Sequence, residues 1–284
     1  NIVIHVFAGD NPKFWENQLS TATTEVICVD LLGGCKADLM DRNVYGYLLQ
    51  LAASGRVRAI LGGPPCRTVS ALRFQQDGGP RVVRNEEWPY GVPDLSTTEA
   101  ELVMNDTVLF FRYLSLYVVA EDVRRLNDPV TQFILEQPED PARYRSAEDV
   151  AAHGYMSIFR TKEWRDFQKK YNLHMLHFDQ GPMGHERRKP TTLGTSMEVL
   201  LQLDGLRGEP SQPVAAHVDQ PLQQRIEASK RWACWAPGLK LALAAAIEQH
   251  LQMLDREKSA REHGARHLFQ RAEHASLRPL NDGR

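Results

Sequence analysis

The sequence has little of several features that would assign it to a specialised class. Only four cysteines occur in 284 residues, and their spacings fit neither a zinc site nor a disulfide framework. We therefore expect a reduced, intracellular protein. The expected localisation is nuclear if the protein is eukaryotic. No continuous apolar run reaches the roughly 20 residues of a membrane helix, and no segment has the composition of a signal peptide. These absences predict no membrane partner.

The chain also has a small net charge. The formal net charge is −2, which lacks the cationic excess of many nucleic-acid-binding chains. The balance is uneven: residues 1–180 hold 19 Lys and Arg against 24 Asp and Glu, whereas residues 181–284 hold 15 against 12. This distribution permits a polyanionic partner for the last third without requiring one.

Short apolar segments alternate with segments of helical spacing. The segments "IVIHVFA" (2–8), "EVICVDLL" (25–32) and "VRAILGG" (57–63) are rich in β-branched residues, as buried strands are. Residues 44–55 have helical spacing and end at a glycine. The alternation predicts an α/β fold with a doubly wound, mostly parallel sheet and helices on both faces. Further helices are expected at 100–121, 161–171 and 238–254, and further strands at 133–138, 173–180 and 189–196.

Three segments depart from this rhythm. Residues 73–98 contain three prolines, three glycines and mixed charge, which is typical of a functional or disordered insert. Residues 204–224 are rich in Gly, Pro and Gln and are expected at the surface. Residues 255–284 are charged, and we expect a helical extension or a linker.

The ends of the first two predicted strands favour a nucleoside site. The first ends in "FAGD", with Gly9 and Asp10, and the second ends at Asp30. In doubly wound sheets ligands bind at the carboxyl ends of strands, where an acidic side chain suits ribose hydroxyls. The glycine-rich pyrophosphate pattern of NAD and FAD sites is missing, which leaves room for a ligand without phosphates, such as S-adenosylmethionine. The alternative is an ordinary strand-to-helix turn.

The third predicted strand is followed by Pro64, Pro65 and then Cys66. The prolines stiffen the loop. A helix beginning near Thr68, together with Arg67, would lower the thiol pKa and activate Cys66 as a nucleophile. The alternative is a small buried apolar residue, which is a common fate of free cysteine.

Two further polar groups are expected at the same sheet edge. Glu136 ends the strand at 133–138 and can share a proton with a ring nitrogen; the alternative is a surface carboxylate. Arg187, Arg188 and Lys189 precede the strand at 189–196 and can hold a phosphate or orient a carboxylate; the alternative is a solvated charge run. His174, His177 and His185 could suggest a metal site, but no second ligand pattern supports one, so no metal is expected.

Taken in order, these segments resemble the cytosine-C5 methyltransferase family, over about residues 1–196 and 232–252. The matching positions are Phe7-Ala8-Gly9, Asp30, Asp38-Leu39, Pro65-Cys66 with Ser70, Glu136, Arg187-Arg188-Lys189, and a final helix that begins after Trp235. The chain is a divergent example. Arg67 stands where the family has Gln, Gln137-Pro138 follow the glutamate where the family has Asn-Val, and the last motif lacks its Gly-Asn.

The resemblance implies a Rossmann-like class I methyltransferase fold with a very small recognition region, and it implies the site residues. S-adenosylmethionine, whose product is S-adenosylhomocysteine, is expected at Phe7, Ala8, Gly9, Asp10, Asp30, Leu31, Asp38, Leu39, Pro64 and Trp235. Cys66 would attack C6 of cytosine and Glu136 would bind N3 and the exocyclic amine, with both Glu136 and the base O2 oriented by Arg187 and Lys189. Double-stranded DNA with a flipped base is the expected partner, held by Arg67, Ser70, Arg73, Arg81, Arg84 and Arg188.

These expectations divide the chain into four parts. They are a catalytic core (1–196) containing the insert 73–98, a reduced recognition segment (197–231), a final core helix (232–254) and the charged tail (255–284). The expected activity is methylation of cytosine C5 in DNA. Two alternatives remain open: an inactive nucleic-acid-binding or regulatory module, suggested by the altered motif residues, and a transfer-RNA cytosine-C5 methyltransferase, since one branch of the family acts on tRNA.

Overall fold

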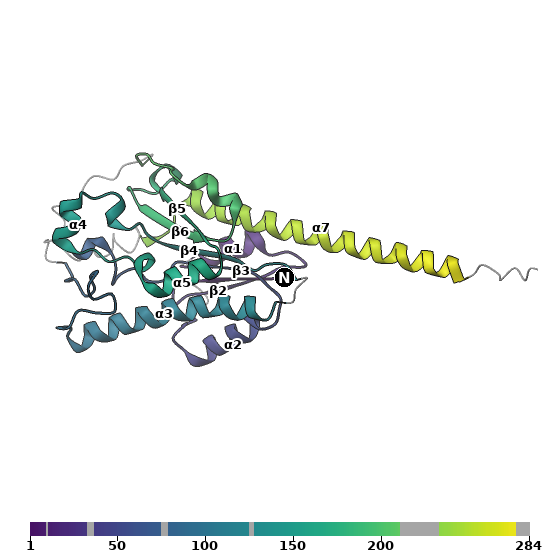
Figure 1. Cartoon of the computed structure of the whole chain (residues 1–284), viewed down its shortest axis with the longest axis horizontal. Helices are drawn as coiled ribbons and strands as arrows, with labels where there is room; N and C mark the ends of the chain where they lie inside the picture. Colours follow the sequence, from purple (N-terminus) through teal and green to yellow (C-terminus); the bar gives the residue numbers. More distant parts are fainter. Residues whose placement is uncertain (10, 33–36, 75–78, 125–127, 211–232, 277–284) are drawn as a thin grey trace, which may run out of the picture.

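A single sheet organises the chain in a computed structural model that describes residues 1–9, 11–32, 37–74, 79–124, 128–210 and 233–276. Within these residues six strands lie in the order β2-β1-β3-β4-β6-β5 (Figure 1). Strands β2, β1, β3 and β4 are parallel neighbours, whereas β6 is antiparallel to both β4 and β5. The bounds are β1 Ile2–Val6, β2 Glu25–Val29, β3 Val57–Gly62, β4 Gln132–Pro138, β5 His174–Asp179 and β6 Pro190–Thr195.

Helices cover both faces of the sheet. One face packs against α1 and α7 through a core that includes Trp15, Leu239 and Ile247, and the other packs against α2, α3 and α5 through Leu48, Phe110 and Trp164. The bounds are α1 Pro12–Leu19, α2 Arg42–Ala52, α3 Thr97–Asp122, α4 Ala147–His153, α5 Lys162–Lys170 and α7 Pro237–Ser276. This doubly wound, mostly parallel sheet with one reversed strand near its edge is a Rossmann-like α/β fold, as the sequence predicted.

Helix α3 is the central helix of its face. Ser96 and Glu99 form a reciprocal capping box at its start, which satisfies backbone donors that the first turn leaves open. By length and composition alone α3 could cross a bilayer. It lies here in the core, where Phe110, Leu114 and Tyr117 are buried among the residues of the sheet.

Several elements differ from the sequence expectations. The short helices α1 and α4 were not predicted, because α1 is only eight residues long and begins directly after the turn that follows β1. Helix α7 continues from the core through residue 276, so most of the charged tail is a helical extension that projects from the body (Figure 1). The expected recognition segment 197–231 begins with a 3-10 turn, Glu198–Leu203, and its residues 211–231 lie outside the described residues.

Candidate active site

The turn after β1 has an unusual backbone. Phe7 has φ of 62° and Gly9 has φ of 76°, and an aromatic residue in the left-handed region is a rare, costly conformation. Both Phe7 and Ala8 donate their N–H groups to the Val29 carbonyl, at 2.8 and 3.3 Å, which holds the turn against the end of β2. Strain of this kind concentrates at ligand sites.

Asp30 joins this turn to the end of β2. Its Oδ2 accepts from the Gly9 N–H at 2.8 Å, and its Oδ1 accepts from the Leu32 N–H at 2.7 Å. Each carboxylate oxygen can accept a further hydrogen bond. A Cβ added at Gly9 would meet no atom of the described residues within 4 Å, so the turn is open toward that part of the chain. A carboxylate beside an open turn at the carboxyl edge fits a nucleoside ligand.

Four further predicted cofactor residues lie in or near the segments after β1 and β2. Leu31 is 65% exposed beside Asp30, and Asp38 accepts from the Met40 N–H at 2.7 Å. Leu39 is 3% exposed, because its side chain packs in the core, and its expected place beside the cofactor stays a prediction. Asp10 lies outside the described residues.

The loop from β3 to Cys66 is held tightly by its neighbours. A Cβ on Gly62 would lie 2.5 Å from the Val6 carbonyl oxygen, so only glycine allows this approach of β3 to β1. At Gly63 a Cβ would lie 3.1 Å from Oε2 of Glu136. The side-chain amide of Gln137 donates to the Pro64 carbonyl, which fastens the loop to β4.

The expected activation of Cys66 is wrong for this state of the protein. Cys66 is followed by a turn, closed by the Val69 N–H at 3.0 Å from the Cys66 carbonyl, and not by an α-helix near Thr68. Arg67 forms an ion pair with the buried Asp106 of α3 at 2.9 Å, and the Thr68 hydroxyl donates to the same carboxylate at 3.0 Å. Both residues therefore anchor the loop.

The surroundings of the Cys66 thiol favour its neutral form. Burial, and then the charge of Glu136, raise the Cys66 pKa to about 11, although Lys189 acts in the opposite direction. At neutral pH only about one molecule in ten thousand carries the thiolate. An activated nucleophile at Cys66 therefore requires a change that bound substrate or cofactor would bring.

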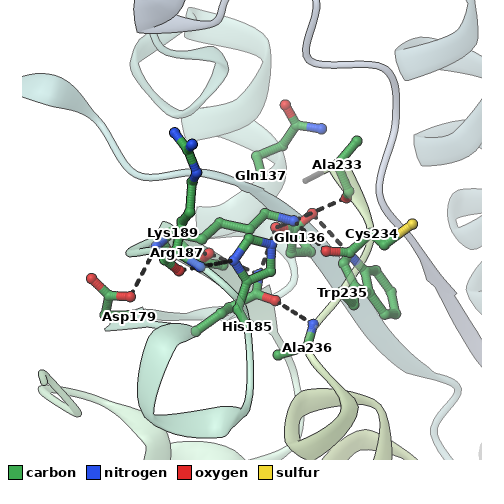
Figure 2. A network of polar contacts seen from close by, with 12 residues as sticks. Glu136, Gln137, Asp179, His185, Arg187, Lys189, Ala233, Cys234, Trp235 and Ala236 are labelled. Carbon is green, nitrogen blue, oxygen red and sulfur yellow. Dashed lines mark hydrogen bonds and ion pairs between the residues drawn. The ribbon is translucent and has the colours of Figure 1, made fainter. Parts of the chain in front are cut away.

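Glu136 is the centre of a buried polar network (Figure 2). It is 6% exposed, which excludes the surface-carboxylate interpretation. Its Oε1 accepts from Gln180 Nε2 at 3.1 Å and lies 3.5 Å from Lys189 Nζ. Its Oε2 accepts from the indole Nε1 of Trp235 at 2.9 Å. Glu136 is thus held by donors from the residue before β6, from the residue after β5 and from the segment before α7.

Gln180 is a member of this network that sequence reasoning missed. It is fully buried, donates to both Glu136 and the Thr191 hydroxyl, and accepts from the Ala236 N–H at 2.8 Å. Its place at the end of a predicted strand was the available signal, because that end meets the same sheet edge as Glu136.

The three consecutive cations 187–189 have separate partners. Lys189 Nζ donates to the carbonyls of Ala233 and Cys234 at 2.9 and 3.1 Å while it lies beside Glu136 (Figure 2). Arg188 pairs with the buried Asp179 at 3.2 Å. The Arg187 carbonyl lies 2.8 Å from Nδ1 of His185, and burial lowers the pKa of the Arg187 guanidinium. Of the three, Lys189 has a direct contact with the Glu136 carboxylate.

The insert arginines hold the insert together. Arg84 is 5% exposed and donates to the Val103 carbonyl at 2.6 Å, so the prediction that it contacts DNA phosphates is wrong. Arg81 pairs with Asp94 and Glu99 at 2.9 and 2.8 Å. Arg73 donates to the carbonyls of Arg67 and Arg81, and the hydroxyl of Ser70 accepts from the Leu72 N–H at 3.3 Å. The predicted cationic surface is therefore largely engaged internally.

Within the described part of the chain, no group of three His, Cys, Asp or Glu side chains is placed to hold a metal ion.

No family model matches the chain, and no curated protein matches its sequence. Among solved structures, the chain is similar to a mutant of Spodoptera frugiperda DNMT2, with 14% identity and a TM-score of 0.36. The match covers 75% of this chain and 56% of that one, so the chain spans little more than half of that protein's length. This is a distant likeness in shape.

Proposed function

We propose that the chain is an S-adenosylmethionine-dependent methyltransferase that modifies C5 of cytosine in DNA. The observation that supports this most is the meeting of Glu136, Lys189 and the Cys66 loop at one sheet edge. Lys189 Nζ lies 3.5 Å from Glu136, and a Cβ on Gly63 would lie 3.1 Å from the same carboxylate. The antiparallel direction of β6 supports the assignment, because it brings Lys189, just before that strand, to the carboxyl ends of β3 and β4.

The cofactor would be held beside the turn of residues 7–9, with Asp30 as the acceptor for its ribose. When bound there, S-adenosylmethionine supplies an electrophilic methyl group. The open space over Gly9 and the exposed Leu31 beside Asp30 support this place. The chain's own part is to orient the nucleoside through carboxylate and backbone groups at the ends of β1 and β2.

Cys66, once deprotonated, forms a bond from Sγ to C6 of the flipped base, which makes C5 electron-rich. Glu136 accepts from the exocyclic amine and stabilises the ring as its charge changes. Lys189 orients Glu136 and donates to the base O2. After methylation the proton on C5 leaves to a base and the Sγ–C6 bond breaks, which restores both the aromatic ring and the thiolate.

A second candidate, an inactive nucleic-acid-binding module, is favoured by two observations. In the present state the Cys66 pKa is about 11 and Oε2 of Glu136 is already bonded to Trp235. A module of this kind would bind S-adenosylhomocysteine without any methyl transfer. Calorimetry with S-adenosylhomocysteine, beside an activity assay, separates the two candidates.

The test is transfer of tritiated methyl groups to duplex DNA, with total tRNA as a parallel substrate. We expect label in DNA with wild type and with the control Cys28→Ala, which removes a thiol from β2 only, and at least a thousandfold less label with Cys66→Ser. Label in tRNA alone would change the substrate class. Wild-type rates in Cys66→Ser would contradict the mechanism.

A further inference from the structure

We propose that residues 233–236 form a strap over the active site, and that the Trp235 indole occupies the place of the substrate base until a base displaces it. The proposal rests on the proposed function, because it takes Glu136 as the group that binds the base. It adds a step of regulation that the resemblance to known methyltransferases does not supply.

The indole bridges the two halves of the proposed site. It stacks on the His5 ring of β1 at 5.4 Å between centroids with an interplanar angle of 25°. At its other side Nε1 donates to Glu136 of β4. Between them, a Cβ on Gly63 at the end of β3 would lie 3.3 Å from the same Nε1. The indole therefore lies across β1, β3 and β4, between the turn assigned to the cofactor and the carboxylate assigned to the base.

The chemistry of the contact resembles that of a bound base. A planar aromatic ring presents one N–H to a carboxylate, as the exocyclic amine of cytosine would. Oε1 of Glu136 is engaged by Gln180 and Lys189, and the indole of Trp235 donates to Oε2. Oε2 can accept a second hydrogen bond, but a base that approached it from the side of the indole would meet the ring, so the base and Trp235 would compete for that space.

Two residues of the Glu136 network also hold the strap. Lys189 Nζ donates to the Ala233 and Cys234 carbonyls, and Gln180 accepts from the Ala236 N–H. Ala236 is buried at the start of α7, whereas Ala233 and Cys234 are exposed. Withdrawal of residues 233–235 about this fixed point would free Lys189 to donate to a base at the moment when Oε2 becomes open.

The His5 ring, on which the Trp235 indole stacks, is consistent with a strap that moves away. His5 is 2% exposed, and neither of its ring nitrogens has a hydrogen-bond partner in the part of the chain that is described. Its ring lies between Trp15 at 4.5 Å and Trp235. Buried polar atoms without partners are costly, and withdrawal of Trp235 would open the His5 ring to solvent or ligand.

The first test compares wild type with Trp235→Phe, which keeps an aromatic ring but removes the N–H. The matched control is Trp88→Phe, in the exposed part of the insert. Each full-length protein is titrated, in the presence of S-adenosylhomocysteine, with a short fluorescent single-stranded oligonucleotide that holds one cytosine. A hydrogen bond to a charged group that no longer has to be broken gives about tenfold tighter binding or more. We expect this gain in Trp235→Phe alone, together with a lower KM for methylation; unchanged or weaker binding would overturn the strap and make Trp235 a positioning residue for Glu136.

A second measurement does not depend on oligonucleotide binding by a variant. Wild type labelled with 5-fluorotryptophan is observed by fluorine NMR, and Trp235→Phe identifies the Trp235 resonance. We expect this resonance to move when the cytosine oligonucleotide is added and to stay in place with an abasic oligonucleotide. A Trp235 resonance that is unmoved while cytosine is bound would overturn the proposal.

Failure of the strap and failure of the proposed function give different results. If wild type binds and methylates cytosine but Trp235→Phe gains nothing, the strap is wrong and the function stands. If Glu136→Gln binds the cytosine and abasic oligonucleotides as wild type does, Glu136 does not bind the base, and both proposals fall.

Discussion

The Cys66 thiol gives a prediction that can be worked through from the structure. Burial and the Glu136 charge raise its pKa to about 11, against about 8.5 for a free cysteine. At pH 8 the thiolate fraction is then about 1 in 1,000, whereas a free thiol has about one-quarter. We therefore expect Cys66 to react with iodoacetamide at least a hundredfold more slowly than glutathione at this pH.

The assay follows alkylation of the Cys66 peptide by mass spectrometry between pH 7 and 9.5. Because the pKa lies above this range, the rate should rise about tenfold per pH unit throughout, without a plateau. Slow access of the reagent alone would lower the rate but would not remove a plateau. A plateau below pH 9 would therefore refute the account of the Cys66 environment.

Glu136→Gln tests the cause of the shift. Burial is the larger cause and stays, so removal of the Glu136 charge should speed alkylation at pH 8 by less than tenfold. The control is Glu198→Gln on the exposed 3-10 turn after β6, which should leave the rate unchanged. Equal rates in Glu136→Gln and wild type would show that the charge has no part in the shift.

The remaining predictions concern stability in urea unfolding. Burial lowers the His5 pKa to about 3, against about 6.5 in the unfolded chain. Because only the unfolded chain then takes up a proton at His5, the free energy of unfolding of wild type should fall by about 2 kcal/mol more than that of His5→Phe between pH 6 and pH 4.5. The same pH dependence of the free energy of unfolding in both proteins would contradict this. Arg67→Gln leaves the buried Asp106 without its cation and should lower the free energy of unfolding by about 1–2 kcal/mol. If Arg67→Gln lowers it by the same amount in an Asp106→Asn background, the ion pair is not the source of the loss. In Gly62→Ala the new Cβ would lie 2.5 Å from the Val6 carbonyl oxygen, so the free energy of unfolding should fall by about 1–3 kcal/mol. In Gly46→Ala the new Cβ lies in open space on α2, so the free energy of unfolding should stay the same or rise. Similar losses in both variants would refute the steric argument.

The parts of the fold that depend on local pattern were predictable. Strands β1 to β3 are apolar runs bounded by glycine or polar residues, and the long helices α3 and α7 have dense apolar faces. The reversed direction of β6 was not predictable, because an apolar run has the same pattern in either direction. That direction matters most for the site, since it brings Lys189 to Glu136.

The residues that meet at the carboxyl edge of the sheet could be predicted, but their contacts could not. Strand ends and family order placed Cys66, Glu136 and Lys189 at this edge. The pairing of Arg67 with Asp106, 39 positions away in α3, left no signal in the sequence. In the same way Trp235 was assigned to the cofactor, while its indole bonds a carboxylate 99 positions earlier. Such pairings depend on packing, which no local pattern contains.

The central claim is that Cys66 forms a bond to C6 of cytosine during methylation. The most direct measurement incubates the protein and S-adenosylmethionine with duplex DNA that contains 5-fluorocytosine, whose fluorine cannot leave as a proton does. We predict a complex that survives denaturation and maps to the Cys66 peptide, and none with Cys66→Ser. Formation of 5-methylcytosine without a trapped complex, or a complex mapped to another cysteine, would contradict the account.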